Sequence, residues 1–196
     1  GDQGDDTLRG GGGSDSILGG SGDDVAAGGS GNDLIEGGEG DDRLNGNAGD
    51  DTVSGDTGSD TLKGGSGNDL ILGEFGSDIL VGGSGDDVLI GGVNQDTMTG
   101  GAGSDTFLYR NDRHGVDLIT DFEAGVDLFD LTALVESDSF TSDTPFEDYI
   151  QLNQTGSDTV VRFDSGGDRI PNQFVTLARL ENVVATDLSA SDFVFS

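Results

Sequence analysis

One aspartate recurs every nine residues through the first half of the chain. Within each nine-residue unit this aspartate is position six, position one is glycine in all twelve copies, and position four is glycine in all but one, where Asn94 stands. A carboxylate held beside a glycine-rich turn, repeated in phase, is a ligand set suited to a hard cation. The twelve candidate ligands are Asp6, Asp15, Asp24, Asp33, Asp42, Asp51, Asp60, Asp69, Asp78, Asp87, Asp96 and Asp105.

The turn composition predicts Ca²⁺ rather than magnesium. Calcium takes roughly 6–8 oxygen ligands and mixes carboxylates with backbone carbonyls, whereas magnesium requires a smaller octahedron and retains its waters. Glycine allows positive φ and a close approach of carbonyl groups that a Cβ would obstruct. We therefore expect the aspartates to share each ion with turn carbonyls, those of Gly20, Gly22, Gly28, Gly29, Gly31, Gly37, Gly38, Gly40, Gly64, Gly65, Gly67, Gly82, Gly83 and Gly85.

These turns must be positioned by short strands. Position eight is apolar in every copy, and alternation along a strand points it inward while positions seven and nine face outward. With two nonapeptides to a coil, odd copies stack into one parallel sheet and even copies into the other. The sequence predicts an all-β fold, a parallel β-roll (β-helix) of twelve nonapeptide repeats over residues 1–108, with six turn residues and three strand residues in each copy.

The number of calcium ions depends on the same stacking. Pairing each copy with the copy two further along gives at most about ten inter-turn sites. Two turns depart from the pattern and are expected to bind more weakly. Copy nine places Glu74 and Phe75 in its turn, and copy eleven reads Gly91-Gly92-Val93-Asn94-Gln95-Asp96.

The pattern Gly-Gly-x-Gly-x-Asp-x-apolar-x resembles the RTX (repeats-in-toxin) repeat, which implies calcium binding. The segments after the repeats are also similar to a known arrangement. Asp105-Thr106-Phe107-Leu108-Tyr109, Asp117 to Phe122 and Gly125 to Leu131 resemble the region after the repeats in serralysin-type proteases, alginate epimerase modules and large bacterial adhesins. The resemblance implies that this region caps the roll and leads to an uncleaved type I secretion signal, here Asp187 to Ser196.

Composition bounds the partners. Residues 1–108 carry 22 acidic and 3 basic residues, and the remainder 17 and 5, for a net charge of −31. This excess of negative charge disfavours nucleic acid and anionic membranes as partners. The chain lacks cysteine, and its apolar runs are shorter than the ~20 residues of a membrane span. Because the roll core is thin and glycine is costly to order, we expect a disordered chain without calcium and folding coupled to calcium binding.

Composition changes at residue 108. Residues 1–108 contain 32 of the 37 glycines, and residues 109–196 contain 10 of the 12 Phe and Tyr residues. Residues 109–196 therefore predict a β-rich cap. An outward apolar stripe on the even sheet, Leu70, Leu72, Val88, Ile90 and Leu108, suggests that the cap folds back over copies eight to twelve. The expected strands are Val116 to Phe122, Tyr149 to Leu152, Thr159 to Phe163, Gln173 to Leu177 and Asp192 to Phe195, with a helical turn at Leu131 to Val135.

Nothing in the sequence predicts an enzyme. His114, the single histidine, lies in a polar stretch, and neither a Gly-x-Ser-x-Gly elbow nor a His-Glu-x-x-His motif accompanies it. Adjacent carboxylates such as Asp86 and Asp87 result from the repeat, so they are turn residues before they are an acid–base pair. We expect no catalytic residues.

Three classes of function remain. The first is a calcium-dependent folding and secretion module, extracellular or cell-surface associated, with the type I secretion machinery as a partner through its C-terminus. The second is an adhesin-associated module that binds polysaccharide or a cell surface, which a glycan array would distinguish. The third is an ice-binding roll, which requires a flat outward rank of Thr and Asx. Other residues interrupt that rank here: Arg9, Arg43, Lys63, Leu70, Leu72 and Ile90. Because the chain begins inside the repeat, we expect it to be the C-terminal piece of a longer protein.

Overall fold

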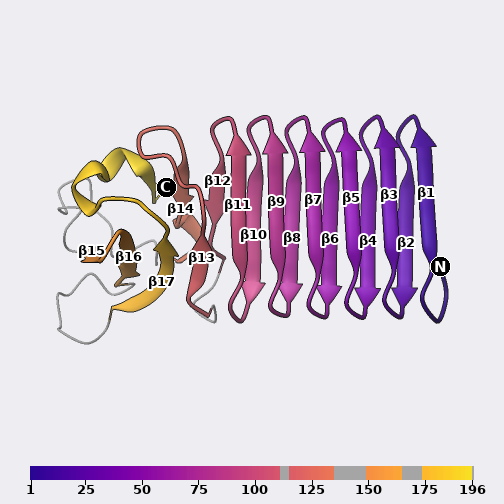
Figure 1. The fold of residues 1–196 in the computed structure, drawn as a ribbon, viewed down its shortest axis with the longest axis horizontal. Coiled ribbons are helices and arrows are strands. Elements are labelled where there is room, and N and C mark those ends of the chain that lie inside the picture. Colours follow the sequence, from indigo (N-terminus) through magenta and orange to yellow (C-terminus); the bar gives the residue numbers. More distant parts are fainter. Residues whose placement is uncertain (111–114, 135–148, 165–173, 196) are drawn as a thin grey trace.

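The computed structural model is an all-β solenoid that ends in a broader cap (Figure 1). It describes residues 1–110, 115–134, 149–164 and 174–195. His114, predicted to lie in a polar loop, falls outside these residues. The N-terminus lies at the far end of the roll, and the C-terminus lies in the cap.

The roll consists of twelve strands that alternate between two sheets. Those of the first sheet are β1 (Thr7–Gly12), β3 (Val25–Ser30), β5 (Arg43–Ala48), β7 (Thr61–Ser66), β9 (Ile79–Ser84) and β11 (Thr97–Ala102). Those of the second are β2 (Ser16–Ser21), β4 (Leu34–Glu39), β6 (Thr52–Thr57), β8 (Leu70–Phe75), β10 (Val88–Val93) and β12 (Thr106–Leu108). The predicted parallel stacking of odd on odd and even on even copies is confirmed.

Within each sheet the register advances by two nonapeptides. Thr7 pairs with Val25 and Leu8 with Ala26, and the same offset relates β2 to β4 and each later pair within the roll. Position eight faces inward as predicted. Ile35, Val53, Leu62, Ile71, Leu80 and Leu89 are each 0% exposed. The core of the roll is therefore a single column of aliphatic side chains between two sheets, with turns along both flanks.

The strands are longer than the sequence indicated. Each full-length roll strand runs six residues, from position seven to position three of the next copy, so the turn is reduced to positions four to six. Glycine at position two, such as Gly20 at φ 120° and Gly38 at φ 114°, pairs across coils in a conformation that other residues rarely adopt. The prediction of a six-residue turn was wrong because it treated every glycine as a turn residue.

The cap extends both sheets instead of starting a new core. Its elements are β13 (Asp117–Ile119), β14 (Leu128–Asp130), η1 (Thr132–Leu134), β15 (Ile150–Thr155), β16 (Asp158–Phe163), β17 (Val175–Leu180), η3 (Ala185–Asp187), η4 (Ala190–Asp192) and β18 (Phe193–Val194). β13 pairs with β11 and then with β17, while β14 pairs with β12 and then with β18. β15, β16 and β17 are antiparallel and finish the larger sheet.

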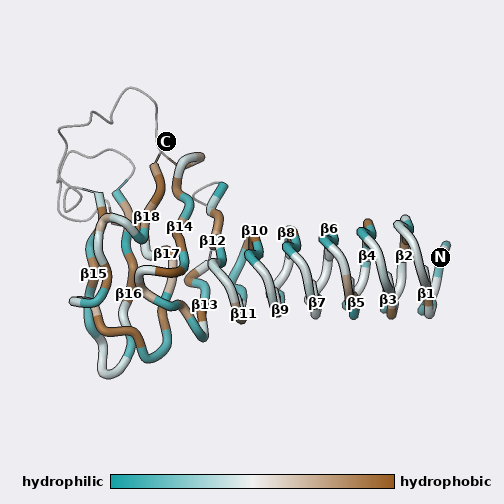
Figure 2. The backbone as a smooth tube through the Cα atoms, turned by 90° about the horizontal axis from the view of Figure 1, so that it is seen from above, coloured by the Kyte–Doolittle hydropathy of each residue, from teal (hydrophilic) through white to brown (hydrophobic). Residues whose placement is uncertain are grey.

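These strands fall close to the five that the sequence predicted, and η1 to the predicted helical turn. β14 was not among those five. The proposed fold-back of the cap over the even sheet is wrong for the described strands, which stack on the end of the roll (Figure 2). The open hydrogen-bonding edges of β11 and β12 are the better template, because an unpaired strand edge needs partners more than an apolar stripe does.

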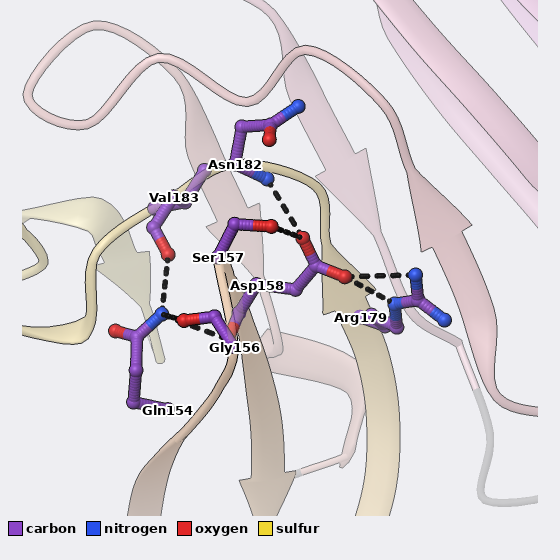
Figure 3. Close-up of polar contacts among 7 residues, drawn as sticks. All are labelled: Gln154, Gly156, Ser157, Asp158, Arg179, Asn182 and Val183. Carbon is purple, nitrogen blue, oxygen red and sulfur yellow. Dashed lines mark hydrogen bonds and ion pairs between the residues drawn. The ribbon is translucent and has the colours of Figure 1, made fainter.

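The core of the cap contains an aromatic cluster, and the partly exposed carboxylate of Asp158 has several donors. Phe129 is 0% exposed, and its ring lies 5.0 Å from that of Phe122 and 5.2 Å from that of Phe193. At the hairpin between β15 and β16, the Asp158 carboxylate accepts hydrogen bonds from Arg179, from the Ser157 hydroxyl and from the Asn182 amide (Figure 3).

Candidate calcium sites

The position-six aspartates form a continuous column along each flank of the roll. One carboxylate oxygen, Oδ1, accepts the backbone N–H of the aspartate one coil earlier: Asp24 Oδ1 from Asp6 at 2.7 Å, and Asp87 Oδ1 from Asp69 at 2.8 Å. Asp24 to Asp105 are all buried, and Asp6 and Asp15 are half-buried at the open end. Alternation explains this placement, since a residue two before an inward position eight also points inward.

The second oxygen has no donor in all but the first repeat, where Asp6 Oδ2 accepts the Asp2 N–H. Oδ2 is buried and makes no hydrogen bond in eleven of the twelve repeats, Asp15 through Asp105. It lies against the position-one glycine of its own copy, where a Cβ on Gly19 would collide with Asp24 and one on Gly82 with Asp87. Position one is therefore glycine because this space belongs to the carboxylate. A buried carboxylate oxygen without a donor calls for a cation.

The carbonyls of adjacent turns face each other beside this oxygen. Position-one carbonyls point back one coil: the oxygens of Gly37 and Gly64 lie against Gly19 and Gly46. Contacts of the same kind involve Gly19, Gly55, Gly91 and Gly100, which the sequence-based set omitted. Carbonyls of positions two and four point forward one coil, as the contacts of Gly20, Gly65, Gly83, Gly22, Gly31, Gly40, Gly67 and Gly85 show. The remaining predicted carbonyl ligands, Gly28, Gly29, Gly38 and Gly82, occupy equivalent places in the repeat.

Electrostatics indicate the same need for positive charge. We call each position-six aspartate of the column a rung. Burial, together with the negative charge of neighbouring aspartates, raises the pKa of Asp60 and Asp87 to about 7. Burial raises the pKa of Asp69, Asp78 and Asp96 to about 6. In each case the hydrogen bond from the preceding rung opposes this effect and is the weaker influence. The fold thus holds a row of carboxylates that are costly to ionise unless cations accompany them.

This donor set fits calcium. Among the described residues no three Asp, Glu, His or Cys side chains come together, so any ion in the roll must be held by few carboxylates and several backbone carbonyls. Oxygen-only ligation of mixed type, at turns made flexible by glycine, suits Ca²⁺ better than magnesium or zinc. The repeat aspartates with the turn carbonyls would hold the ions, which supply the positive charge that the column lacks.

Position five forms a second column that the sequence did not reveal. Its side chains accept N–H groups in the opposite direction: Asp41 N–H donates to Asp23 Oδ1 at 2.9 Å, and Asp86 N–H to Asn68 Oδ1 at 3.0 Å. These residues are exposed. Position five is Asp in five copies and Asn in two, with Ser or Gln in the rest, against invariant Asp at position six; this preference for a side-chain oxygen acceptor was the available signal.

The main column also continues past the last repeat. Asp96 N–H donates to Asp117 Oδ1 and Asp105 N–H to Asp127 Oδ1, both at 3.0 Å. Sequence spacing did not place these residues in the column, because the offset lengthens from 18 to 21 and 22 residues. The signal was an Asp directly before an apolar strand residue, as in Asp127-Leu128-Phe129, which repeats positions six to eight. The two additional rungs give copies eleven and twelve a following coil.

The irregular turns of copies nine and eleven keep the hydrogen bonds between successive position-six aspartates. Asp78 Oδ1 accepts the Asp60 N–H at 2.8 Å and Asp96 Oδ1 accepts the Asp78 N–H at 2.9 Å. Copy nine differs elsewhere: the Gly76 N–H to Val93 oxygen bond is 3.4 Å, against 2.6–2.9 Å at equivalent bonds such as Gly67 to Ser84. Weaker calcium binding at copies nine and eleven stays a prediction.

The described residues contain no helix long and apolar enough to cross a membrane. The fold resembles the extracellular lipase LipA from Serratia marcescens, with a TM-score of 0.54 and 19% identity over 98% of this chain. This chain spans 38% of the length of that lipase chain. Two subunits of the Azotobacter vinelandii mannuronan C5-epimerase are also similar: AlgE6R3, at 27% identity with a TM-score of 0.40, and AlgE6R2, at 25% identity with a TM-score of 0.38. They cover 75% and 80% of this chain and 78% and 88% of their own.

Curated protein sequences gave no match. The model of the RTX calcium-binding nonapeptide repeat matches residues 1–35, 18–53, 27–62, 45–80, 54–89 and 72–107. Together these matches cover residues 1–107 of 196, more than half of the chain. The buried aspartates at position six and the glycines at position one are the residues that carry this repeat. The chain therefore belongs to the RTX calcium-binding nonapeptide-repeat family, and its β-roll is a Ca²⁺-binding module of the kind typical of secreted proteins.

Proposed function

We propose that this chain is the calcium-dependent folding and secretion module at the C-terminus of a type I-secreted extracellular bacterial protein. It is disordered in a low-calcium cytosol, crosses the envelope unfolded, and folds outside when calcium fills the turns. The supporting observation is the column of buried Oδ2 atoms without donors along both flanks. A fold that buries so many unpaired carboxylates is unstable until cations neutralise them.

The magnitudes favour a switch between compartments. Extracellular calcium modules have dissociation constants of ~10⁻⁴–10⁻³ M, well above cytosolic calcium. The roll supplies one aliphatic side chain per nonapeptide, which does not offset the ordering of so many glycines. Folding free energy therefore comes from metal binding, and the two processes occur together.

The C-terminal segment is the proposed contact with the type I exporter. An acidic residue, Asp192, precedes the short apolar finish Phe193-Val194-Phe195, the arrangement that the family resemblance implies for such a signal. Deleting residues 187–196 from the parent protein is expected to retain it in the cytosol of a host that carries a matching exporter. Undiminished export would place the signal elsewhere.

The folding half of the proposal is tested by circular dichroism. The chain is dialysed against chelator and titrated with calcium, and with magnesium as the matched control. We expect a cooperative change from coil to β-structure with calcium and none with magnesium over the same range. A chain already fully β-structured in chelator would overturn the proposal, and so would equal folding by magnesium.

A further inference from the structure

The C-terminal segment contributes the last strand of the eight-stranded sheet. β18 pairs with β14, and the Leu131 N–H donates to the Val194 oxygen at 2.9 Å. Phe193 is 5% exposed and stacks on Phe129, with 5.2 Å between ring centroids and 10° between ring planes. A segment held by strand pairing and by a buried ring is inaccessible to a receptor that reads an extended chain.

One carboxylate fastens this segment to the cap. Asp192 is 1% exposed, and its Oδ1 accepts the Gly125 N–H at 2.6 Å across 67 residues of sequence. Its Oδ2 accepts the Ser189 N–H at 2.6 Å and the Ser189 hydroxyl at 2.9 Å. Both oxygens are therefore satisfied by the protein, unlike those of the repeat aspartates. Asp187, five residues earlier, is exposed and provides a matched control.

Asp192 is hydrogen-bonded to the turn around Gly125, and this turn also contains Asp127, the last aspartate of the carboxylate column on that flank. Gly125 lies between Glu123 and Asp127, and the Glu123 N–H donates to Asp127 Oδ2 at 2.8 Å. Asp127 Oδ1 in turn accepts the N–H of Asp105, the position-six aspartate of the final repeat. One compact turn is thus bonded to the calcium column on one side and to the C-terminal segment on the other.

We propose that calcium-driven folding of the roll controls access to the C-terminal segment, with Asp192 as the latch that docks residues 187–195 onto the turn of Asp127. Before calcium binds, Asp105 is not ordered and cannot hold Asp127 in place, so the turn is not formed and the segment is free. After calcium binds, the rung at Asp105 orders the turn, Gly125 presents its N–H, and the segment docks as β18. Docking itself needs no export function. That the docked segment is also the export signal rests on the proposed function.

The test is hydrogen exchange of the full-length chain across a calcium titration. In the wild type, amides of residues 187–195 should become protected over the same calcium range as those of β12 and β14. Asp192→Ala should leave protection of β1–β11 intact while exchange in residues 187–195 accelerates by roughly tenfold or more, the scale expected for losing a charge-assisted buried bond. Asp187→Ala should change neither.

Two results would overturn the latch: protection of residues 187–195 in excess chelator, or full protection in Asp192→Ala. If Asp192→Ala also unfolds the roll, Asp192→Asn decides. Asn keeps an acceptor for Gly125 but not both bonds to Ser189, so intermediate protection supports the latch and wild-type protection contradicts it. An export assay separates the two proposals. If deletion of residues 187–196 leaves export unchanged while exchange behaves as expected, the secretion role fails and the calcium-dependent docking stands.

Discussion

A partly exposed carboxylate of the cap and a buried carboxylate of the roll have opposite surroundings. In the cap, Asp158 accepts hydrogen bonds from Asn182, Ser157 and Arg179, and these interactions lower its pKa (Figure 3). In the roll, Asp87 is buried with Oδ2 lacking a donor, and burial raises its pKa to about 7. Protein donors alone satisfy Asp158, whereas Asp87 leaves a place for a cation.

This difference explains why the cap can terminate the roll. The aromatic cluster around Phe129 continues the apolar core of the roll into the cap, and the parallel pairings of β13 and β14 cover the last open edges of the roll. Stability along a stack of this kind depends on neighbours, so the coil beside the cap should be the last to open.

The largest effect expected from this comparison is that acid partly replaces calcium. In the calcium-free fold, burial raises the pKa of Asp60 and Asp87 to about 7 and of Asp69, Asp78 and Asp96 to about 6, against 3.8 in the unfolded chain. The folded state then binds more protons than the unfolded state between these values, so its stability rises as pH falls through about 7. Chelated protein should gain β-structure by circular dichroism between about pH 8 and pH 5.

High salt at about pH 8 is the control, because it screens surface repulsion without protonating buried groups. Salt alone should not produce the β-signal. Refolding by salt as fully as by acid would show that general repulsion in a chain of net charge −31, and not the buried column, opposes folding. Acid that produces no β-structure would contradict the role given to the column.

The second expected effect separates two adjacent carboxylates of one turn. Asp87→Asn removes a buried charge from the column. Asp86→Asn changes an exposed acceptor, and the amide oxygen of Asn can still accept the Ser104 N–H, as Asn68 accepts the Asp86 N–H. In calcium, Asp87→Asn should destabilise the fold by about 1–3 kcal/mol and Asp86→Asn by much less. In chelator the order should reverse, because Asp87→Asn relieves an unpaired buried charge. Denaturant melts in calcium measure the first effect, and the β-signal that each variant retains by circular dichroism in chelator measures the second; identical behaviour in both conditions would remove the distinction between the two columns.

Sequence periodicity predicted the roll well because one rule, nine residues with an inward position eight, fixes strand direction, register and core together. It placed the aspartates beside the turns but could not show that Oδ1 and Oδ2 have different partners, since that depends on contacts one coil away. Asp117 and Asp127 were missed because the inserted residues change the spacing while the hydrogen bonding is preserved. The predicted position of the cap was wrong because the unpaired edges of β11 and β12, and not the apolar stripe, determine where the cap strands pair.

The smallest effect concerns position along the roll. Asp69 belongs to a regular copy with its turn glycines in place, whereas Asp96 follows Asn94 at position four, at φ 84°, in a turn that contacts the cap through Gly115. Asp69→Ala should lower calcium stoichiometry and raise the calcium midpoint of folding more than Asp96→Ala does, because the regular turn offers the better cage and lies farther from the support of the cap. Isothermal titration with a parallel folding titration measures both. The two changes remove the same carboxylate from columns of the same design, so equal losses would mean that the rung alone determines binding and that neither turn sequence nor distance from the cap matters.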